Sequence, residues 1–302
     1  MKEKIKAHLW TLGRFFAVPF FGVTLLCGAV IVGGSLGSVD VWLAFIATTL
    51  IMCGGHSFNT LLDTVWTKLD SGEETSVSKG YAGGCNVITE GILSPKEVLA
   101  NALCWYALSL IPLIILAVRV TPLILVPAIL GMGVTFWYSK SKFTTWSHEL
   151  ALASGPVAAS VMGALSTGSG EWLNAFLVAL PIVTIFSFCG LALDEHPDAE
   201  ANLKKGVRSL PYKIWEFGFD LPAYLLLWIV TGYCVQGFLV AADILAPLTG
   251  ITFILLPPTF GLLVYLKGVL DDPEKFKSIA LKIVMTLALY PVLLLVGQAV
   301  GG

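Results

Sequence analysis

The chain has 302 residues, of which 56% are hydrophobic and only 13% are charged, and its mean hydropathy is +0.84. Because soluble domains contain about 25% charged residues, this composition excludes an ordinary soluble protein and indicates a polytopic protein of the lipid bilayer. The formal net charge of −2 argues against a nucleic-acid partner. The six cysteines form no CxxC pair and no His/Cys metal spacing, so we expect them to be structural thiols.

Nine apolar runs are long enough to cross a membrane, which requires about 20 predominantly apolar residues. They predict an all-α fold in which residues 1–302 form a single transmembrane helical bundle. The first run is too long for a signal peptide and is counted as a true span. The predicted spans cover residues 14–35, 40–62, 96–118, 120–138, 147–168, 173–193, 220–241, 245–267 and 277–299.

The basic residues are distributed unevenly between the two sides of this nine-span arrangement. Seventeen of the 18 lysines and arginines fall on the side of the N-terminus, and the exception is Arg119. The positive-inside rule then predicts a cytoplasmic N-terminus and an external C-terminus. The two longest connections, 64–95 and 194–219, also lie on the basic side, and functional residues concentrate on such loops. We therefore expect the active site at the cytoplasmic face.

Polar residues appear abruptly where the second span should end. On a continuous helix with about 100° between residues, Asn59, Asp63 and Asp70 lie on one stripe, while Lys68 points nearly the opposite way. Two carboxylates on one helical face repel each other, and a divalent cation with oxygen ligands is the simplest group to lie between them. A solvated helix end is the alternative interpretation.

A second acidic cluster follows the sixth span. Asp194 and Asp198 repeat the four-residue spacing of Asn59 and Asp63, and Pro197 predicts that the helix kinks or stops there. Charged residues at membrane depth are costly and usually functional. Two acidic clusters at the same depth could hold Mg²⁺ together with a substrate phosphate, while nearby basic side chains neutralise the remaining phosphate oxygens.

These two motifs resemble those of the UbiA superfamily of intramembrane prenyltransferases. In that family an Asn/Asp motif after the second helix and an Asp motif after the sixth bind Mg²⁺ and an isoprenyl diphosphate. The resemblance covers the nine spans, both motifs and their placement. The spacing from Asn59 through Asp63 to Asp70 is similar to that of the menaquinone and vitamin K branch, as is the loop 83–95, GGCNVITEGILSP.

Further resemblance lies outside the two motifs, and so do some departures. Tyr138, Ser139, Lys142, Glu149, Gly155 and Pro156 resemble the family's helix four to five region, and Arg14 stands where members often carry a basic residue. The departures are Thr67 in place of an aspartate of the ubiquinone-type pattern, Asp194 in place of asparagine, Asn202 in place of a third acid and Asn86 in place of arginine. They concern the acceptor more than the diphosphate site.

The resemblance implies a role for each candidate residue. The expected metal ligands are Asp63, Asp70, Asp194 and Asp198, and the expected catalytic residues are Asp63, Asp198 and Tyr138. The side chains expected to bind the diphosphate are Asn59, Arg14, Lys68, Lys140, Lys142 and Arg208. For the basic residues the alternative is membrane orientation, and for Tyr138 it is the aromatic belt at the interface. His56, His148 and Glu149 stay open between packing and proton transfer.

The implied function is Mg²⁺-dependent transfer of an isoprenyl group from an isoprenyl diphosphate to a lipophilic acceptor, a reaction that must exclude water. An aromatic quinone precursor, as in menaquinone biosynthesis, is the favoured acceptor, and prenylglyceryl phosphate, as in archaeal-type ether-lipid synthesis, is the alternative. A diphosphate lyase or cyclase would share the metal site. A cation-coupled transporter is the alternative from another class, although transporters place their sites near the bilayer midplane.

Overall fold

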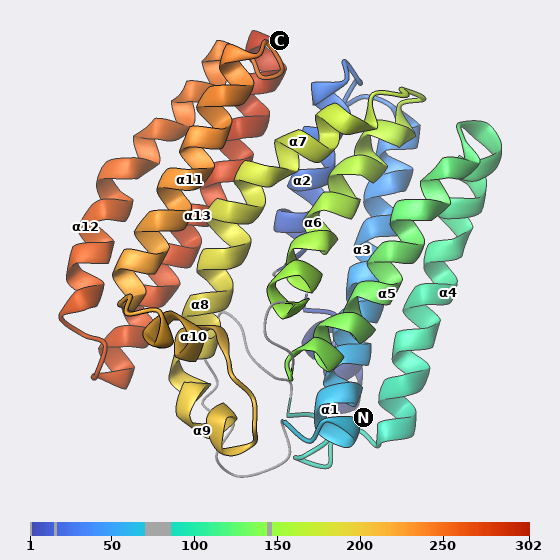
Figure 1. Cartoon of the computed structure of the whole chain (residues 1–302). Helices are drawn as coiled ribbons and strands as arrows, with labels where there is room; N and C mark the ends of the chain where they lie inside the picture. The colour runs from blue at the N-terminus through green and yellow to red at the C-terminus, as the bar shows by residue number, and fades with distance from the viewer. Residues whose placement is uncertain (1, 15–16, 70–85, 144–146) are drawn as a thin grey trace.

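The structure is a computed structural model that describes residues 2–14, 17–69, 86–143 and 147–302. All regular secondary structure in these ranges is helical (Figure 1). In chain order the elements are α1 (Lys2–Lys6), η1 (Ala7–Thr11), α2 (Val18–Ile31), α3 (Val39–Leu61), η3 (Leu62–Trp66), α4 (Pro95–Arg119), η5 (Pro122–Ile124), α5 (Leu125–Ser141), α6 (Ser147–Ser166), α7 (Trp172–Ile182), η6 (Val183–Phe188), α8 (Cys189–Glu195), η7 (His196–Asp198), α9 (Ala199–Lys204), α10 (Leu210–Glu216), α11 (Leu221–Ala241), η8 (Pro247–Leu255), α12 (Leu256–Lys267) and α13 (Pro273–Gly301).

The predicted all-α membrane fold is confirmed, with one span shorter than expected. Within the described ranges, eight helices are long and apolar enough to cross a membrane. The remaining predicted span, 14–35, is present as the shorter apolar helix α2, which carries Pro19 in its first turn. Proline is well placed there because the N–H groups of a first helical turn have no intrahelical acceptor.

The sixth span is longer than the sequence predicted. The helical run Trp172–Lys204 continues past residue 193 and past Pro197. The regular α-helix α8 nevertheless ends at Glu195, as the proline predicted, and Pro197 lies at the start of the 3-10 turn η7, where its missing N–H costs no hydrogen bond. The expected loop 194–219 therefore contains the two short helices α9 and α10.

The third helix does not continue regularly to residue 70. After Leu61 the chain makes one π-helical turn, η3, and Lys68 has a φ of +57°, which a right-handed helix does not contain. The stripe that was expected to align Asp70 with Asp63 lacks the continuous helix that it requires. Asp70 itself lies outside the described residues.

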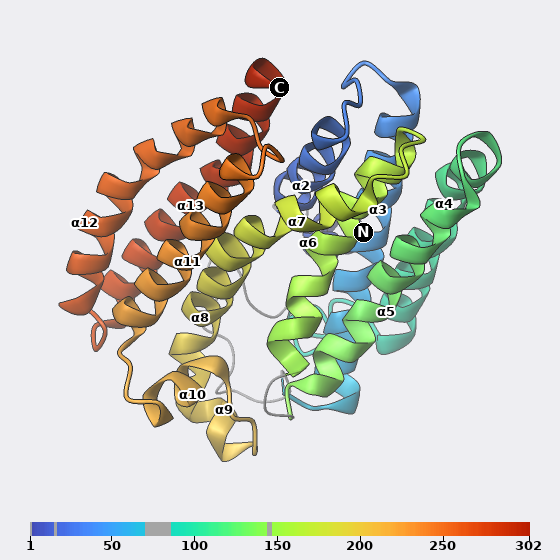
Figure 2. The same cartoon turned by 45° about the horizontal axis from the view of Figure 1, so that its top comes forward.

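Helix α2 lies at the centre of the bundle. It packs against α3, α6, α7 and α13, and Figures 1 and 2 show it between α13 on one side and α3 and α6 on the other. A Cβ added to Gly28 would stand 1.9 Å from the carbonyl oxygen of Ser160, and one added to Gly163 would stand 2.0 Å from that of Leu25. Small residues that let backbones approach this closely are typical of helix packing in membranes.

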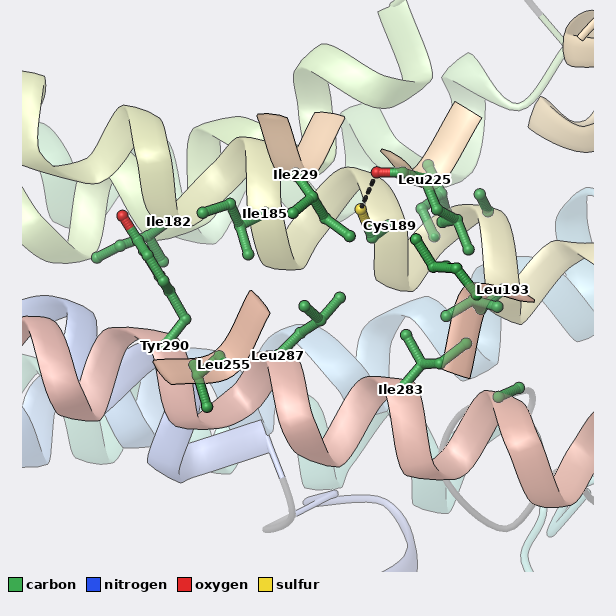
Figure 3. Packing of buried hydrophobic residues seen from close by; sticks show 14 of the residues in the cluster. Ile182, Ile185, Cys189, Leu193, Leu225, Ile229, Leu255, Ile283, Leu287 and Tyr290 are labelled. Atoms are coloured by element: carbon green, nitrogen blue, oxygen red, sulfur yellow. Dashed lines mark hydrogen bonds between the residues drawn. The ribbon is translucent and has the colours of Figure 1, made fainter. Parts of the chain in front are cut away.

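Two clusters of buried apolar residues fill the two halves of the bundle. One joins the run α7–α8 to α11 and α13 through residues that include Ile185, Leu225 and Leu287 (Figure 3). The other joins α2, α3, α5 and α6 and includes Ile51 and Met162. Since lipid is as apolar as these side chains, the clusters hold the helices together by close packing rather than by exclusion from water.

The two ends of the chain lie at opposite ends of the bundle (Figure 1). The N-terminal end carries α1, α9 and α10, together with the C-terminal ends of α3 and α5 and the start of α6. At the other end, α3 begins and α4 finishes, and there Arg119 Nε lies 3.1 Å from Asp40 Oδ1. Arg119, which the sequence pattern set apart from the other basic residues, thus has a carboxylate partner.

Candidate active site

A cavity of about 560 Å³ lies between α3, α5, α6 and α8, and the N-terminal segment forms part of its wall. Its deeper part is lined by apolar side chains of α2, α3, α5 and α6. Its charged and amide side chains, with one histidine and one tyrosine, are Glu3, Lys6, Arg14, His56, Asn59, Asp63, Asn86, Glu90, Tyr138, Lys142, Asp194, Glu195, Asp198 and Asn202. The two motifs, more than 130 residues apart in the chain, therefore meet in one cavity.

Most of the candidate residues named from the sequence line this cavity. They are Arg14, Asn59, Asp63, Tyr138, Lys142, Asp194 and Asp198. Three basic candidates are not among the lining residues of the described chain. Lys68 is exposed two residues after η3, Lys140 Nζ lies 5.1 Å from the Trp66 ring centroid, and Arg208 Nη2 lies 3.5 Å from Glu216 Oε1. Their contact with a diphosphate stays a prediction.

The α3 side of the cavity is organised around Asp63, which is 2% exposed. Asn59, one helical turn earlier, donates from Nδ2 to Asp63 Oδ2 at 2.9 Å and to Ser139 Oγ at 2.8 Å. Lys142 Nζ donates to the same Oδ2 at 2.5 Å. The other carboxylate oxygen, Asp63 Oδ1, is buried and has no hydrogen-bond partner among the described residues. A buried acceptor without a partner is costly, so this oxygen is available to a ligand.

Tyr138 lies beside two nitrogen-bearing groups. Lys142 Nζ is 5.1 Å from the centroid of its ring, and the His148 ring centroid is 4.4 Å away at an interplanar angle of 33°. His148 Nε2 is 2.9 Å from Glu195 Oε1, and Glu195 Oε2 accepts the Leu210 N–H at 2.7 Å. These buried contacts fix the aromatic ring against α6 and α8.

Asp194 and Asp198 bring the second motif to the cavity. Asp194 lies near the end of α8, and Asp198 is the last residue of the 3-10 turn η7. Both are half-buried, and both line the cavity that Asp63 lines. The tight turn at Pro197 thus keeps the two carboxylates at the end of the same helical run.

The charges of the cavity wall do not balance. Among the described lining residues there are six carboxylates, Glu3, Asp63, Glu90, Asp194, Glu195 and Asp198, against the three cations Lys6, Arg14 and Lys142. A highly charged anion would be repelled by such a wall. Divalent cations would reverse the balance, so the donor set suits an anion that arrives with metal.

The residues present fit Mg²⁺. No group of three or more His, Cys, Asp or Glu side chains in the described ranges is arranged to hold a metal ion by itself. Mg²⁺ does not need such a cage, because it usually takes one or two carboxylates and completes its shell with water and substrate phosphates. Asp63 Oδ1 offers one oxygen without a partner in the described chain for this purpose.

Several residues of the site were not singled out from the sequence. Glu195 is visible there only as part of the acidic cluster, and Glu3 and Lys6 only as residues before the first span. The N-terminal segment reaches the cavity because α4 holds it: Lys4 Nζ lies 2.8 Å from Glu97 Oε1, and Asn101 Nδ2 donates to the His8 carbonyl at 3.1 Å. The one available sign was the high density of charge in residues 2–6.

A buried ion pair attaches α10 to α6. Lys213 Nζ lies 2.6 Å from Glu149 Oε1, and both residues are buried. The pair and the Leu210–Glu195 bond together dock the short helix that follows the second motif. Glu149, left open from the sequence, therefore has a structural partner.

Comparisons with known proteins give the family. The model of the UbiA prenyltransferase family matches residues 21–290. No match was found among curated proteins. Three solved structures are similar. The apo structure of a UbiA homolog from Aeropyrum pernix K1 has 15% identity and a TM-score of 0.69, with 92% of this chain and 98% of that chain covered. A digeranylgeranylglyceryl phosphate synthase in membranes has 16% identity and a TM-score of 0.62, with 99% of this chain and 98% of that chain covered. A UbiA homolog from Archaeoglobus fulgidus bound to DMAPP and Mg²⁺ has 13% identity and a TM-score of 0.55, with 93% of this chain and 99% of that chain covered.

Because their sequence identities to this chain are low, the solved structures show that the fold is shared and nothing more specific. The family match is more specific because it extends over most of the chain, from α2 into α13. This membrane-embedded chain is a prenyltransferase and belongs to the UbiA prenyltransferase family.

Proposed function

We propose that this prenyltransferase moves an isoprenyl group from an isoprenyl diphosphate to a lipophilic acceptor, with Mg²⁺ held jointly by the diphosphate and by carboxylates of the two motifs, drawn from Asp63, Asp194 and Asp198. The observation that carries the proposal is the meeting of these carboxylates in one cavity, where a buried Asp63 oxygen has no partner in the described chain. The homolog bound to DMAPP and Mg²⁺ supports the same donor class. Family membership favours this reaction over the cation-coupled transport considered from the sequence.

The basic and amide side chains of the cavity would bind the diphosphate. When bound, Mg²⁺ acts as a Lewis acid that draws negative charge from the leaving diphosphate. Lys142 and Arg14 face the same cavity and neutralise phosphate oxygens that no metal holds. Asn59 donates to Asp63 and so keeps that carboxylate turned toward the cavity.

Tyr138 is suited to stabilise the allylic cation that forms as the carbon–oxygen bond breaks. Its ring lines the cavity beside Lys142, and the contacts of His148 with the ring and with Glu195 limit its rotation. A cation over an aromatic face gains about 2 kcal/mol when both are desolvated. The apolar wall of α2, α3, α5 and α6 holds the isoprenyl tail and keeps water from the cation.

An aromatic quinone precursor is the acceptor that we favour. The spacing of Asn59, Asp63 and Asp70 and the loop 83–95 resemble the menaquinone and vitamin K branch. The distribution of basic residues further supports a cytoplasmic N-terminus and active site, with the C-terminus outside. Labelling of single introduced cysteines at residues 2 and 302 from either side of sealed vesicles tests this orientation, and label at both positions from one side would contradict it.

Transfer assays on the purified protein test the function. The protein is incubated with Mg²⁺, labelled geranylgeranyl diphosphate and three acceptor conditions: a dihydroxynaphthoate-type aromatic acid, a prenylglyceryl phosphate and no acceptor. We expect an adduct with the aromatic acceptor, lost on chelation and in Asp63→Ala and Asp198→Ala. An adduct with the glyceryl phosphate alone would move the chain to ether-lipid synthesis. Diphosphate release without an adduct would indicate a lyase, and full activity in both variants would reject the metal site.

A further inference from the structure

We propose that His56 on α3 binds the acceptor of the transfer reaction through a hydrogen bond between its imidazole ring and a hydroxyl group of the acceptor. The inference deepens the proposed function and rests on it, because it concerns the aromatic acceptor that we favour. His56 lines the same cavity as the two acidic motifs. In the sequence its role stayed open between packing and proton transfer, and the structure gives it no packing partner for the ring nitrogens in the described chain.

The imidazole ring of His56 is polar and unpaired within the described residues. Its Nε2 atom is buried and has no hydrogen-bond partner there. Its Nδ1 atom also makes no hydrogen bond to a described residue, but it is not among the buried atoms, so a ligand in the cavity can reach it. A buried polar atom without a partner is costly, and an apolar side chain of similar size would avoid that cost. A ligand therefore explains this ring better than packing does.

Two other histidines show what a packing role looks like. His8 Nδ1 lies 3.2 Å from Asn101 Nδ2, and His148 Nε2 lies 2.9 Å from Glu195 Oε1. Each of these rings has a polar partner on another helix. His56 faces the cavity instead of such a partner.

His56 lies where the charged part of the cavity meets the apolar part. Asn59 and Asp63 follow it by three and seven residues, so on α3 all three side chains lie within about 60° of one another. At about 1.5 Å of rise per residue, His56 is about 4.5 Å deeper than Asn59 and about 10 Å deeper than Asp63. The α3 lining residues beyond it, from Gly55 to Thr48, carry no charge.

This boundary is where the acceptor has to react. With the diphosphate at the carboxylates and the isoprenyl tail in the apolar part, the carbon–oxygen bond that breaks lies between them. The attacking carbon of the acceptor must come within about 3–3.5 Å of the donor carbon. In a hydroxylated aromatic acceptor the hydroxyl activates the ring carbon beside it, so the hydroxyl reaches the same boundary. A neutral imidazole offers one donor and one acceptor nitrogen, and a hydroxyl can pair with either.

The backbone that carries His56 is held by close packing. A Cβ added to Gly54 would stand 2.6 Å from Tyr106 Cδ1, and one added to Gly55 would stand 2.6 Å from Thr135 Oγ1. Tyr106 belongs to α4 and Thr135 to α5, so two helices contact α3 directly before His56. A ring on such a fixed segment can orient a substrate, because its own position does not have to be set during binding.

The test compares transfer to a hydroxylated aromatic acid with transfer to its methyl ether at the hydroxyl beside the reacting carbon, using labelled geranylgeranyl diphosphate as the donor. In the wild type kcat/KM should fall at least tenfold from the hydroxyl compound to the ether, because the ether cannot donate a hydrogen bond. His56→Leu should lose at least tenfold on the hydroxyl compound and give nearly equal values for the two acceptors. His56→Asn, whose short amide retains a donor and an acceptor, should recover part of the preference for the hydroxyl.

Two further measurements separate this role from a structural one. His56→Leu removes an unpaired polar ring, so its melting temperature in detergent should stay within about 2 °C of the wild type or rise. Its affinity for a geranylgeranyl thiolodiphosphate with Mg²⁺, measured by calorimetry, should not change. His8→Leu is the matched control: His8 is not among the described lining residues, and this variant should keep the wild-type preference for the hydroxyl.

The outcomes separate this inference from the proposed function. A wild-type preference for the hydroxyl in His56→Leu would overturn it while leaving prenyl transfer intact. Loss of donor affinity in His56→Leu would assign the ring to the diphosphate site, and a melting temperature lower by many degrees would assign it to packing. Transfer to a prenylglyceryl phosphate alone would overturn the aromatic acceptor and this inference with it. Absence of transfer by the wild type to every acceptor would reject the proposed function itself.

Discussion

Substitutions at the Asp63–Lys142 pair can distinguish a structural role of the Asp63 carboxylate from a role in metal binding. Asp63→Ala removes the carboxylate that pairs with Lys142, whose side chain is 16% exposed. Removing one member of a buried pair costs roughly 3–5 kcal/mol, and the residual exposure of Lys142 favours the lower part of this range. At about 2–4 °C per kcal/mol, the melting temperature should fall by roughly 10 °C.

The double variant Asp63→Ala/Lys142→Met removes the lysine cation together with the carboxylate that it pairs with. Because replacing both partners of a buried pair by apolar groups is often close to neutral, most of the lost melting temperature should return. Transfer should not return. Loss of a group that stabilises charge in the transition state costs about 10²–10³-fold in rate, and both variants should show at least this loss in kcat/KM.

Differential scanning fluorimetry in detergent and the labelled-donor assay measure the two quantities on the same preparations. Lys142→Met alone is the matched control, and we expect a higher KM for the donor with a smaller change in kcat. A double variant that regains wild-type transfer together with its stability would refute the reasoning, because Asp63 would then serve only to neutralise Lys142.

Three further predictions concern the ring, the helix contact and α10. Tyr138→Phe should keep most of the transfer rate, while Tyr138→Leu should lose at least tenfold in rate, because the cation–π contribution of the ring is about 2 kcal/mol. If steady-state assays showed equal losses of rate in the two variants, the hydroxyl and not the ring would be the important group. Gly163→Ala should lower the melting temperature by several degrees, since overpacking typically costs about 1–3 kcal/mol, and Gly133→Ala, with open space around it, should not. Lys213→Met should leave Glu149 without its lysine partner and so increase amide hydrogen exchange in α10. The double variant Glu149→Gln/Lys213→Met should restore the protection of α10 from exchange. Unchanged exchange in Lys213→Met would show that the ion pair does not dock this helix.

The fold was largely predictable because its signal is the apolar run. In a bilayer every backbone polar group must be satisfied within its own segment, so a run such as 96–118 specifies a helix, observed as Pro95–Arg119, with little dependence on tertiary context. The errors lie where backbone geometry departs from the α-helix. Residue spacing does not reveal the π-helical turn after Leu61, whereas Pro197 marked the position at which α8 gives way to a 3-10 turn.

The site was predictable in its acids and less so in its surroundings. Asp63 and Asp198 stand out as carboxylates at the ends of apolar runs, which is a costly placement. Lys142, Lys140 and Lys68 look alike in sequence, and only the approach of α5 to α3 brings Lys142 to Asp63. The sequence did not indicate the hydrogen bond between Glu195 and His148, because the two residues are 47 positions apart and lie on different helices.

The most direct test of the account is Mg²⁺-dependent binding of a donor that cannot react. Isothermal titration calorimetry of the purified protein with a geranylgeranyl thiolodiphosphate requires no acceptor. We predict binding in Mg²⁺ that is lost with a chelator and weakened at least tenfold in Asp63→Ala/Lys142→Met and in Asp198→Ala. Binding of equal affinity without Mg²⁺, or in both variants, would contradict the claim that the two motifs hold a metal–diphosphate complex in one cavity.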